Sequence, residues 1–332
     1  GFFMKSTKFL VLGILILALA FSFTLVSTSA QAKTIKLRIG HEMPENHPYH
    51  LGAIQFGEIL KEKTDGRIEV IVYPSGQLGK QKELAEMVAA NQLDGCLVWQ
   101  GILEGYDPNV GVICLPFIFD NWEHTWAVVD GEIGQKVLKP VEDKGIKVIA
   151  VFNNGLYNIV SRIPIKTPED MKGVKLRVQP SAIFTETGEM LGAVVTPMAF
   201  GEVYSALQLG AIDAAILGPI NIRKSKHYEV AKYTCENHMA FLLEPVLMST
   251  KTFYSLSEND QKAVLEAGHE AAVWQREIAE EADVKDTQFL KENGMNYYQP
   301  DIQLWRAAMM PMYDKHPEWK ETIDQIRSLS KK

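Results

Sequence analysis

Arg177 is the residue of this chain whose position most suggests binding chemistry. Over 174–181, apolar residues alternate with Lys175, Arg177 and Gln179, which predicts a short strand that runs into a turn. The polar residues then share one face at the strand's C-terminal end, where open α/β sheets bind ligands. A guanidinium group can hold a carboxylate through two parallel hydrogen bonds. The pattern alone does not distinguish this role from that of a solvated surface arginine, which is more common.

The other polar residues form no known catalytic motif. His41-Glu42 approaches the H-E-x-x-H pattern of zinc enzymes, but Pro44 prevents the helix that the pattern requires. His47 and His50 are spaced like metal ligands, yet they stand at a predicted strand-to-helix turn, where we expect surface or cleft residues. There is also no P-loop, G-x-S-x-G or G-x-G-x-x-G pattern. These absences favour binding over catalysis.

An exported enzyme that uses the same cleft is the alternative from another functional class. Such an enzyme needs an acid–base group or a nucleophile near Arg177, and Glu202, Asp213 and His41 are candidates. Each also has a structural explanation. Glu202 can stand in the first turn of a helix, Asp213 can cap a turn, and His41 can be hydrogen-bonded at the end of a strand.

The three cysteines, Cys96, Cys114 and Cys235, are too few and too scattered for a disulfide framework. Cys96 and Cys114 lie in apolar surroundings, so we expect buried free thiols, with one disulfide as the alternative.

The N-terminus has the three parts of a secretory signal peptide. Lys5 and Lys8 precede an apolar run over 9–26, and an Ala-x-Ala site follows at 30–32. We therefore expect a cleavable signal peptide over 4–32 and a mature protein in the periplasm. An uncleaved membrane anchor is the alternative, because the apolar run is close to the shortest that spans a bilayer.

The net charge argues against nucleic acid as a partner. The 332-residue chain has a formal charge of −7, and without Lys5 and Lys8 it has 32 basic and 41 acidic residues. Such a surface is a poor non-specific binder of nucleic acid.

The remaining 300 or so residues alternate short strands with helices twice over, which predicts an α/β fold of two similar lobes with mostly parallel sheets. The expected strands cover 35–39, 68–72, 96–99, 174–178, 194–197 and 214–217, and the expected helices cover 48–64, 81–91, 181–191 and 200–209.

A long helix is predicted over 258–292. Ser257 is a suitable N-cap, apolar residues recur at helical spacing, and Asn293-Gly294 is a suitable stop. Its length of roughly 50 Å is enough to span both lobes. The alternative is two helices with a break between 282 and 286.

Several segments together resemble the DctP-like solute-binding proteins of TRAP (tripartite ATP-independent periplasmic) transporters. They are 161–178 (SRIPIKTPEDMKGVKLRV), 196–213 (TPMAFGEVYSALQLGAID), 73–79 (YPSGQLG) and 115–117 (LPF). The resemblance covers nearly all of the predicted mature chain. It implies a non-enzymatic protein whose two lobes close at a hinge on an organic acid, with Arg177 holding the carboxylate. It also implies that the ligand passes to TRAP membrane permease subunits.

The resemblance also implies how the lobes divide the chain. Lobe I is expected over 33–154 and about 243–280, and lobe II over 155–242 and about 283–310. Residues 311–332 form a C-terminal segment.

This chain departs from the family pattern at several expected ligand contacts. Leu217 stands where a ligand-contacting asparagine is common, and Tyr157 where many members have a second arginine. Trp99 replaces an acidic residue of sialic-acid binders, whereas Phe200 keeps the usual aromatic. The predicted ligand-binding residues are Arg177, Trp99, Tyr157, Phe200, Leu217, Gln179, Glu42 and Asp213.

These departures predict a less polar site. We expect a monocarboxylate or 2-oxo acid with an apolar or aromatic body that stacks on Trp99 and Tyr157, and we expect a highly hydroxylated sugar acid to be disfavoured. The alternatives are a C4-dicarboxylate, with Trp99 and Tyr157 as core residues, or a receptor that presents the ligand to a membrane sensor.

Neither a metal nor another cofactor is predicted. Glu186, Asp213 and Gln179 could supply oxygen ligands of the kind that some relatives use for 2-oxo acids, but no spacing requires it. We expect a monomer.

Overall fold

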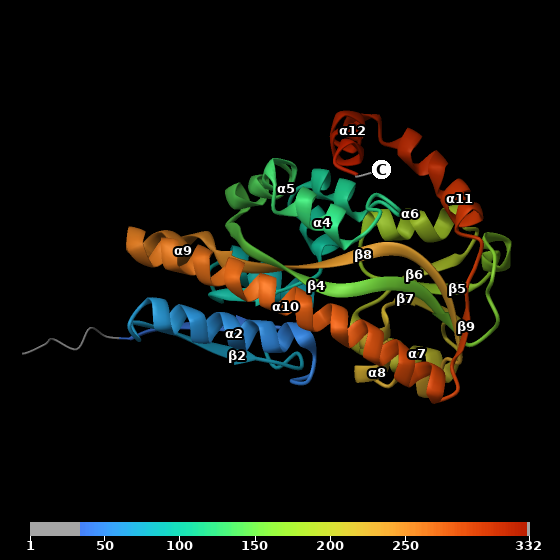
Figure 1. The fold of residues 1–332 in the computed structure, drawn as a ribbon, viewed down its shortest axis with the longest axis horizontal. Coiled ribbons are helices and arrows are strands. Elements are labelled where there is room, and N and C mark those ends of the chain that lie inside the picture. Colours follow the sequence, from blue (N-terminus) through green and yellow to red (C-terminus); the bar gives the residue numbers. More distant parts are fainter. Residues whose placement is uncertain (1–33, 331–332) are drawn as a thin grey trace, which may run out of the picture. The chain divides into compact units, whose positions relative to one another are not determined.

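The computed structural model describes residues 34–330, and the nine strands in this range form one mixed sheet (Figure 1). The strand order is β2-β1-β3-β8-β4-β7-β5-β6, with β9 paired to β8. The bounds are β1 (Ile35–Gly40), β2 (Ile68–Tyr73), β3 (Gly95–Leu97), β4 (Ile146–Ser161), β5 (Lys175–Val178), β6 (Val194–Pro197), β7 (Ala214–Leu217), β8 (Tyr233–Ser249) and β9 (Asn296–Tyr298).

Helices cover both faces of this sheet. They are α2 (Pro48–Lys63), α3 (Gln81–Ala89), α4 (Trp122–Val129), α5 (Glu132–Leu138), α6 (Ala182–Met190), α7 (Val203–Leu209), α8 (Pro219–Lys224), α9 (Thr250–Ser255), α10 (Glu258–Glu292), α11 (Ile302–Lys315) and α12 (Lys320–Ser328). Short 3₁₀ segments, among them η1 (Gln100–Gly105) and η5 (Phe200–Glu202), join them. The α/β class is confirmed, and every strand and helix predicted from the alternation is present.

The two central strands, β4 and β8, differ from the expectation of mostly parallel pairing. They are 16 and 17 residues long and pair with each other antiparallel, whereas β1–β3, β5–β6 and β5–β7 are parallel. Both strands are buried along most of their length because helices cover both faces, so they lack the alternation that reveals a half-exposed strand. This is why the sequence pattern did not predict them.

A bulge interrupts the β4–β8 pairing between Asn153 and Leu156. Gly155 occupies it with φ of +94°, a conformation that glycine adopts without strain. Because the bulge changes the register within β4, it sets which way Asn154 and Tyr157 face relative to the rest of the strand.

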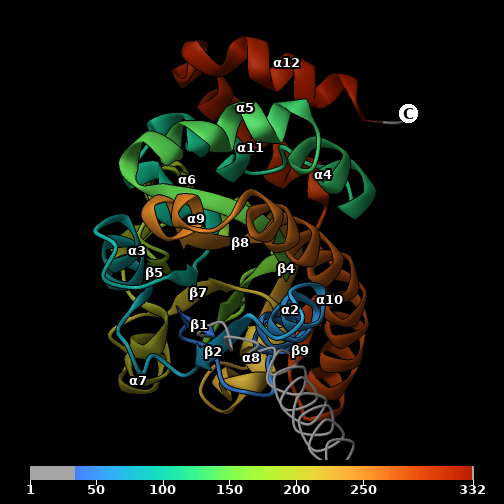
Figure 2. The ribbon, with the colours of Figure 1, turned by 90° about the vertical axis from the view of Figure 1, so that its left-hand side faces the viewer.

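Apolar side chains pack on both faces of the sheet. They form one continuous core on one face and two separate clusters on the other. On the first face, α3, α4, α5, α6, α11 and α12 pack on a continuous core that includes Ile159, Leu176 and Ile216 (Figure 2). On the other face, α2 and the N-terminal half of α10 cover one cluster, and α7, α8 and the C-terminal end of α10 cover another. The expected lobe boundaries stay a prediction, because one sheet joins both halves.

α10 is a single helix of 35 residues, so the predicted continuous helix is confirmed and the alternative with a break between 282 and 286 is wrong (Figure 1). The Ser257 hydroxyl caps it by accepting a hydrogen bond from Asp260 N at 3.1 Å. It packs on α2 near its start and on α8 near its end, and it crosses β4 between them.

The predicted signal peptide lies outside the described residues. Within residues 34–330, no helix combines the length and apolar character needed to cross a membrane. The three cysteines are buried and unpaired, as expected for free thiols.

Candidate functional site

A pocket of about 230 Å³ lies beside the carboxyl ends of the parallel strand pairs β1–β3 and β5–β6. Segments that follow these strands form its walls together with the start of α3 and the middle of β4. The lining residues are Glu42, Met43, Lys80, Gln81, Lys82, Glu83, Trp99, Ile102, Asn154, Tyr157, Arg177, Gln179, Pro180, Ala199 and Phe200. This is the edge of an α/β sheet at which ligands bind.

Arg177 lies in this pocket with only 1 % of its surface exposed. Its Nε donates to the Met198 carbonyl oxygen at 3.0 Å, whereas its Nη1 is buried and has no hydrogen-bond partner among the described residues. Burial lowers the pKa of Arg177 to about 10, while Tyr157, Glu42 and Glu202 act to raise it, so the side chain is cationic at neutral pH. A buried cation with an unused donor is costly unless an anion completes it.

Two further lining residues have unused polar atoms. Trp99 Nε1 and both amide atoms of Gln179 are buried and have no hydrogen bond of normal geometry to a described residue. The Gln179 side chain nevertheless lies near the Tyr157 hydroxyl, where it acts to lower the pKa of Tyr157. The Trp99 ring packs edge-to-face on Phe184, with 5.1 Å between the ring centroids. Because buried polar atoms in folded proteins are nearly always hydrogen-bonded, atoms left unpaired in a pocket indicate that a polar ligand or water binds there.

Tyr157 and Asn154 join the pocket to a buried polar network. The Tyr157 hydroxyl accepts a hydrogen bond from Asn221 Nδ2 at 3.1 Å, and the same nitrogen donates to Asn154 Oδ1 at 3.2 Å. Asn154 Nδ2 in turn donates to Glu244 Oε2 at 2.8 Å. Burial raises the pKa of Glu244 well above its usual value. The sequence analysis missed Asn154, Asn221 and Glu244.

Charged groups line the opposite wall. Burial raises the pKa of Glu42, against the hydrogen bond from Gln81 and the charge of Arg177. Gln81 Oε1 accepts from Trp99 N at 2.8 Å, which fixes the side chain beside the pocket. Lys80 forms an ion pair with Glu202 of η5. Lys80 immediately precedes α3 and Gln81 is its first residue. Neither belongs to a motif, so the sequence analysis missed both.

Six of the eight predicted ligand-binding residues line the pocket: Arg177, Trp99, Tyr157, Phe200, Gln179 and Glu42. Leu217 does not, because it lies in the core that α7 and α8 cover. Asp213 also lies elsewhere: it precedes β7, where its carboxylate accepts from Lys175 N at 3.1 Å. Both placements correct the expectation, since each side chain is committed to a structural contact.

The two histidines predicted as surface or cleft residues are buried, since His47 is fully enclosed and His50 is 9 % exposed. His41, expected to be satisfied at a strand end, is also fully enclosed. His41 Nε2 lies 3.0 Å from His50 Nδ1, and His47 caps α2. No cluster of three or more His, Cys, Asp or Glu residues suited to a metal ion occurs within residues 34–330. Glu186, one of the possible oxygen ligands, is instead paired with Lys315 and His316.

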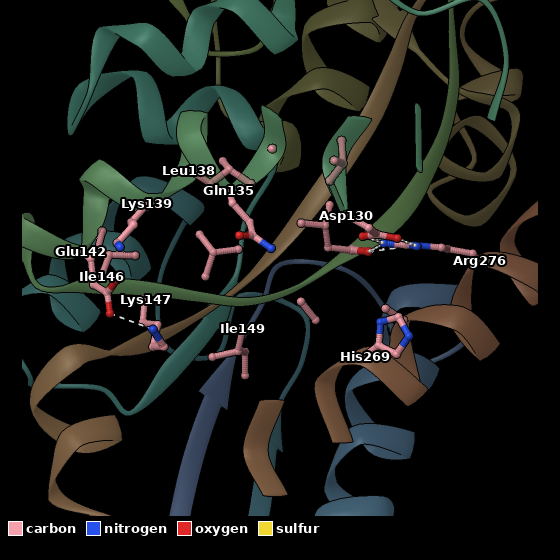
Figure 3. A pocket seen from close by; sticks show the side chains of 16 residues that line it. Asp130, Gln135, Leu138, Lys139, Glu142, Ile146, Lys147, Ile149, His269 and Arg276 are labelled. Atoms are coloured by element: carbon pink, nitrogen blue, oxygen red, sulfur yellow. Dashed lines mark hydrogen bonds and ion pairs between the residues drawn. The ribbon is translucent and has the colours of Figure 1, made fainter. Parts of the chain in front are cut away.

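A second hollow, of about 380 Å³, lies between α5, β4 and α10 (Figure 3). Its most buried charge, Arg276, is fully engaged: Asp130 accepts two hydrogen bonds from it at 2.5 and 2.8 Å, and the Val151 carbonyl accepts another. Lys147 is paired with Glu142 in the same way. Because these charges neutralise each other, this hollow offers an anion less than the Arg177 pocket does.

Comparison with known proteins agrees with this arrangement. A model of bacterial extracellular solute-binding protein family 7 (DctP) matches residues 39–319. A solute-binding protein of Roseobacter denitrificans is 33% identical over 86% of this chain and 87% of its own length. The C4-dicarboxylate-binding periplasmic protein DctP of Rhodobacter capsulatus is 30% identical over 96% of this chain and 97% of its own length.

Solved structures show the same fold. A TRAP periplasmic solute-binding protein from Roseobacter denitrificans with bound β-D-glucuronate has a TM-score of 0.85 and 29% identity, over 88% of this chain and 99% of that one. One from Polaromonas bound to D-erythronate has a TM-score of 0.87 and 28% identity, over 90% of this chain and all of the other. The chain therefore belongs to family 7 of the bacterial extracellular solute-binding proteins, the DctP family of non-enzymatic TRAP periplasmic binding proteins.

Proposed function

We propose that this protein captures a small sugar acid, with Arg177 holding the carboxylate, and delivers it to a TRAP permease in the membrane. The observation behind this proposal is the buried, unpartnered Nη1 of Arg177 in a pocket at the ligand-binding edge of the sheet. A carboxylate supplies both the charge and the acceptor oxygens that this group lacks. Delivery to a permease follows from the family rather than from this site.

The polar lining favours a hydroxylated ligand over the apolar acid expected from the sequence. Gln179 offers an amide group, Trp99 an indole N–H and Glu42 a carboxyl group, whereas both amide atoms of Asn154 are engaged in the buried network. An apolar body would give the buried Gln179 amide no further hydrogen-bond partner, and an unpaired buried polar group costs roughly 1–3 kcal/mol. Hydroxyl groups can donate to and accept from such atoms. The prediction of a less polar binding site relied in part on Leu217, and this residue lies outside the pocket.

The pocket volume supports a small solute. About 230 Å³ is below the roughly 300–1,000 Å³ of pockets for drug-sized ligands, which suits an acid no larger than a monosaccharide. The relatives with bound D-glucuronate and D-erythronate hold acids of this class.

Isothermal titration calorimetry with four acids tests the proposal. D-glucuronate and D-erythronate represent sugar acids, succinate a C4-dicarboxylate and phenylpyruvate an aromatic 2-oxo acid. We expect a sugar acid to bind most tightly. Tightest binding of phenylpyruvate would support the apolar ligand predicted from the sequence, and tightest binding of succinate would support a C4-dicarboxylate protein.

A further inference from the structure

We propose that His47 and Asn221, two buried residues behind the pocket, are positioning residues that make the Tyr157 hydroxyl a hydrogen-bond donor to the bound acid. This inference rests on the proposed function and adds a specificity-determining residue to it. Three links support it: the tautomer of His47, the orientation of the Asn221 amide and the direction of the Tyr157 hydroxyl.

The first link is the tautomer of His47. This residue is the N-cap of α2, and its Nδ1 accepts a hydrogen bond from Tyr49 N at 3.3 Å. Burial lowers the pKa of His47 to about 3, so the ring is neutral at physiological pH. A neutral imidazole has one donor nitrogen and one acceptor nitrogen. Because Nδ1 is the acceptor, Nε2 has the proton and is a donor.

The second link is the orientation of the Asn221 amide. His47 Nε2 and Asn221 Oδ1 are both buried, and neither has a hydrogen-bond partner among the described residues. The Asn221 side chain lies near the His47 ring, where it acts to raise the pKa of His47 against the effect of burial. With the amide oxygen toward His47, the NH₂ group lies toward Tyr157 and Asn154, as its two hydrogen bonds show.

The third link is the hydroxyl itself. Asn221 Nδ2 donates to the Tyr157 oxygen, so the phenolic proton must be directed elsewhere. Tyr157 lines the pocket with Arg177 and Gln179, and only 3 % of its surface is exposed. In the pocket this proton faces the Gln179 side chain, which acts to lower the pKa of Tyr157, and the space for the bound acid, whose oxygens are the stronger acceptors.

The surrounding chain holds Tyr157 and Asn221 together. A Cβ at Gly218, just before α8, would lie 3.3 Å from the Tyr157 ring and 3.0 Å from the Leu156 carbonyl oxygen. Glycine at this position lets the first turn of α8, which includes Asn221, approach the ring closely. Tyr157 then supplies a neutral donor beside Arg177, which is the one lining cation without a carboxylate ion pair among the described residues, since Lys80 and Lys82 pair with Glu202 and Glu86.

A double-mutant cycle tests the donor role, with D-glucuronate as the probe. Asn221→Asp replaces the NH₂ donor with an acceptor, which redirects the Tyr157 proton away from the pocket. We expect Tyr157→Phe and Asn221→Asp each to weaken D-glucuronate binding about tenfold. In the Tyr157→Phe background, Asn221→Asp should cause no further loss. An equal loss in both backgrounds, or wild-type affinity of Asn221→Asp, contradicts the proposal.

His47 is tested by conservative rescue. The amide of His47→Gln can place an N–H group near the position of Nε2, so we expect it to retain the affinity for D-glucuronate. His47→Leu has no donor, and we expect it to bind as weakly as Tyr157→Phe. A purely structural role for His47 predicts that the two variants lose affinity in proportion to their loss of stability, and that result contradicts the proposal.

A measurement without ligand separates this inference from the proposed function. The Fermi doublet of tyrosine in Raman difference spectra, wild type minus Tyr157→Phe, reports whether the phenol donates or accepts. We expect a phenol that accepts in the wild type and only donates in Asn221→Asp. An unchanged doublet overturns the inference, whereas failure of D-glucuronate to bind while the doublet changes counts against the proposed ligand alone.

Discussion

Gln275 of α10 binds both backbone groups of Asn153 in β4. Its Oε1 accepts from Asn153 N at 2.7 Å, and its Nε2 donates to Asn153 O at 2.8 Å. Asn153 stands where the bulge interrupts the pairing of β4 with β8, so its backbone needs partners from outside the sheet. The Gln275 side chain thus fixes the strand segment that presents Asn154 and Tyr157 to the pocket.

Gln275→Ala should destabilise the fold by about 2–4 kcal/mol, because it leaves two buried backbone groups without partners. Urea unfolding measures the change in the free energy of unfolding. Gln288→Ala is the matched control, since Gln288 is an exposed glutamine of the same helix. Equal stability of the two variants would show that the contact with β4 contributes little.

Asp283 of α10 should make stability depend on pH. Burial, followed by the charges of Asp286, Glu236 and Glu280, raises the pKa of Asp283 from 3.8 to about 7. Between these values the folded protein keeps a proton that the unfolded chain has lost, so the free energy of unfolding falls as the pH rises through this window. Asp283→Asn should remove that dependence and stabilise the protein at pH 8 by about 2–4 kcal/mol.

Thermal or urea unfolding at pH 5 and pH 8 measures the effect of Asp283→Asn. Asp260→Asn, in the first turn of the same helix, is a control of opposite sign. The hydrogen bond from Arg67 lowers the pKa of Asp260, so its carboxylate is stabilising above pH 4. Asp260→Asn should therefore destabilise the protein at neutral pH, and destabilisation by both variants would contradict the assignment for Asp283.

Leu217→Ala separates core packing from ligand contact. Leu217 is fully buried in the core that α7 and α8 cover, so we expect a loss of about 2–5 kcal/mol in unfolding free energy. Calorimetric affinity for D-glucuronate should be unchanged at a temperature where the variant is folded. Leu209→Ala is the control, because Leu209 is 81 % exposed. A large loss of affinity in Leu217→Ala would restore Leu217 to the binding site.

The sequence predicted best the elements whose apolar residues follow a clear period or whose ends have suitable capping residues. The caps of α10 at Ser257 and Asn293 are examples, as is the strand that ends near Arg177. Resemblance to the family selected Arg177, Tyr157 and Phe200, and these three residues line one pocket. The resemblance did not predict that Leu217 packs in the core. A leucine at the position of a ligand-contacting asparagine need not point into the same pocket.

The missed residues depend on contacts between distant parts of the chain. Asn154 is positioned by Glu244 and Asn221, which are 90 and 67 residues away in sequence. His47 could not be separated from a surface histidine, since its burial arises from the packing of α2 against the rest of the fold. No local pattern contains this information.

The central claim is that Arg177 holds the carboxylate, and Arg177→Lys tests it most directly by calorimetric titration with D-glucuronate. Lysine keeps the positive charge but lacks the planar array of donors, so we expect the affinity to fall about 30-fold or more. Arg162→Lys, at a half-exposed arginine that pairs with Asp213 outside the pocket, should bind as the wild type does. Equal, undiminished affinity of both variants would contradict the account.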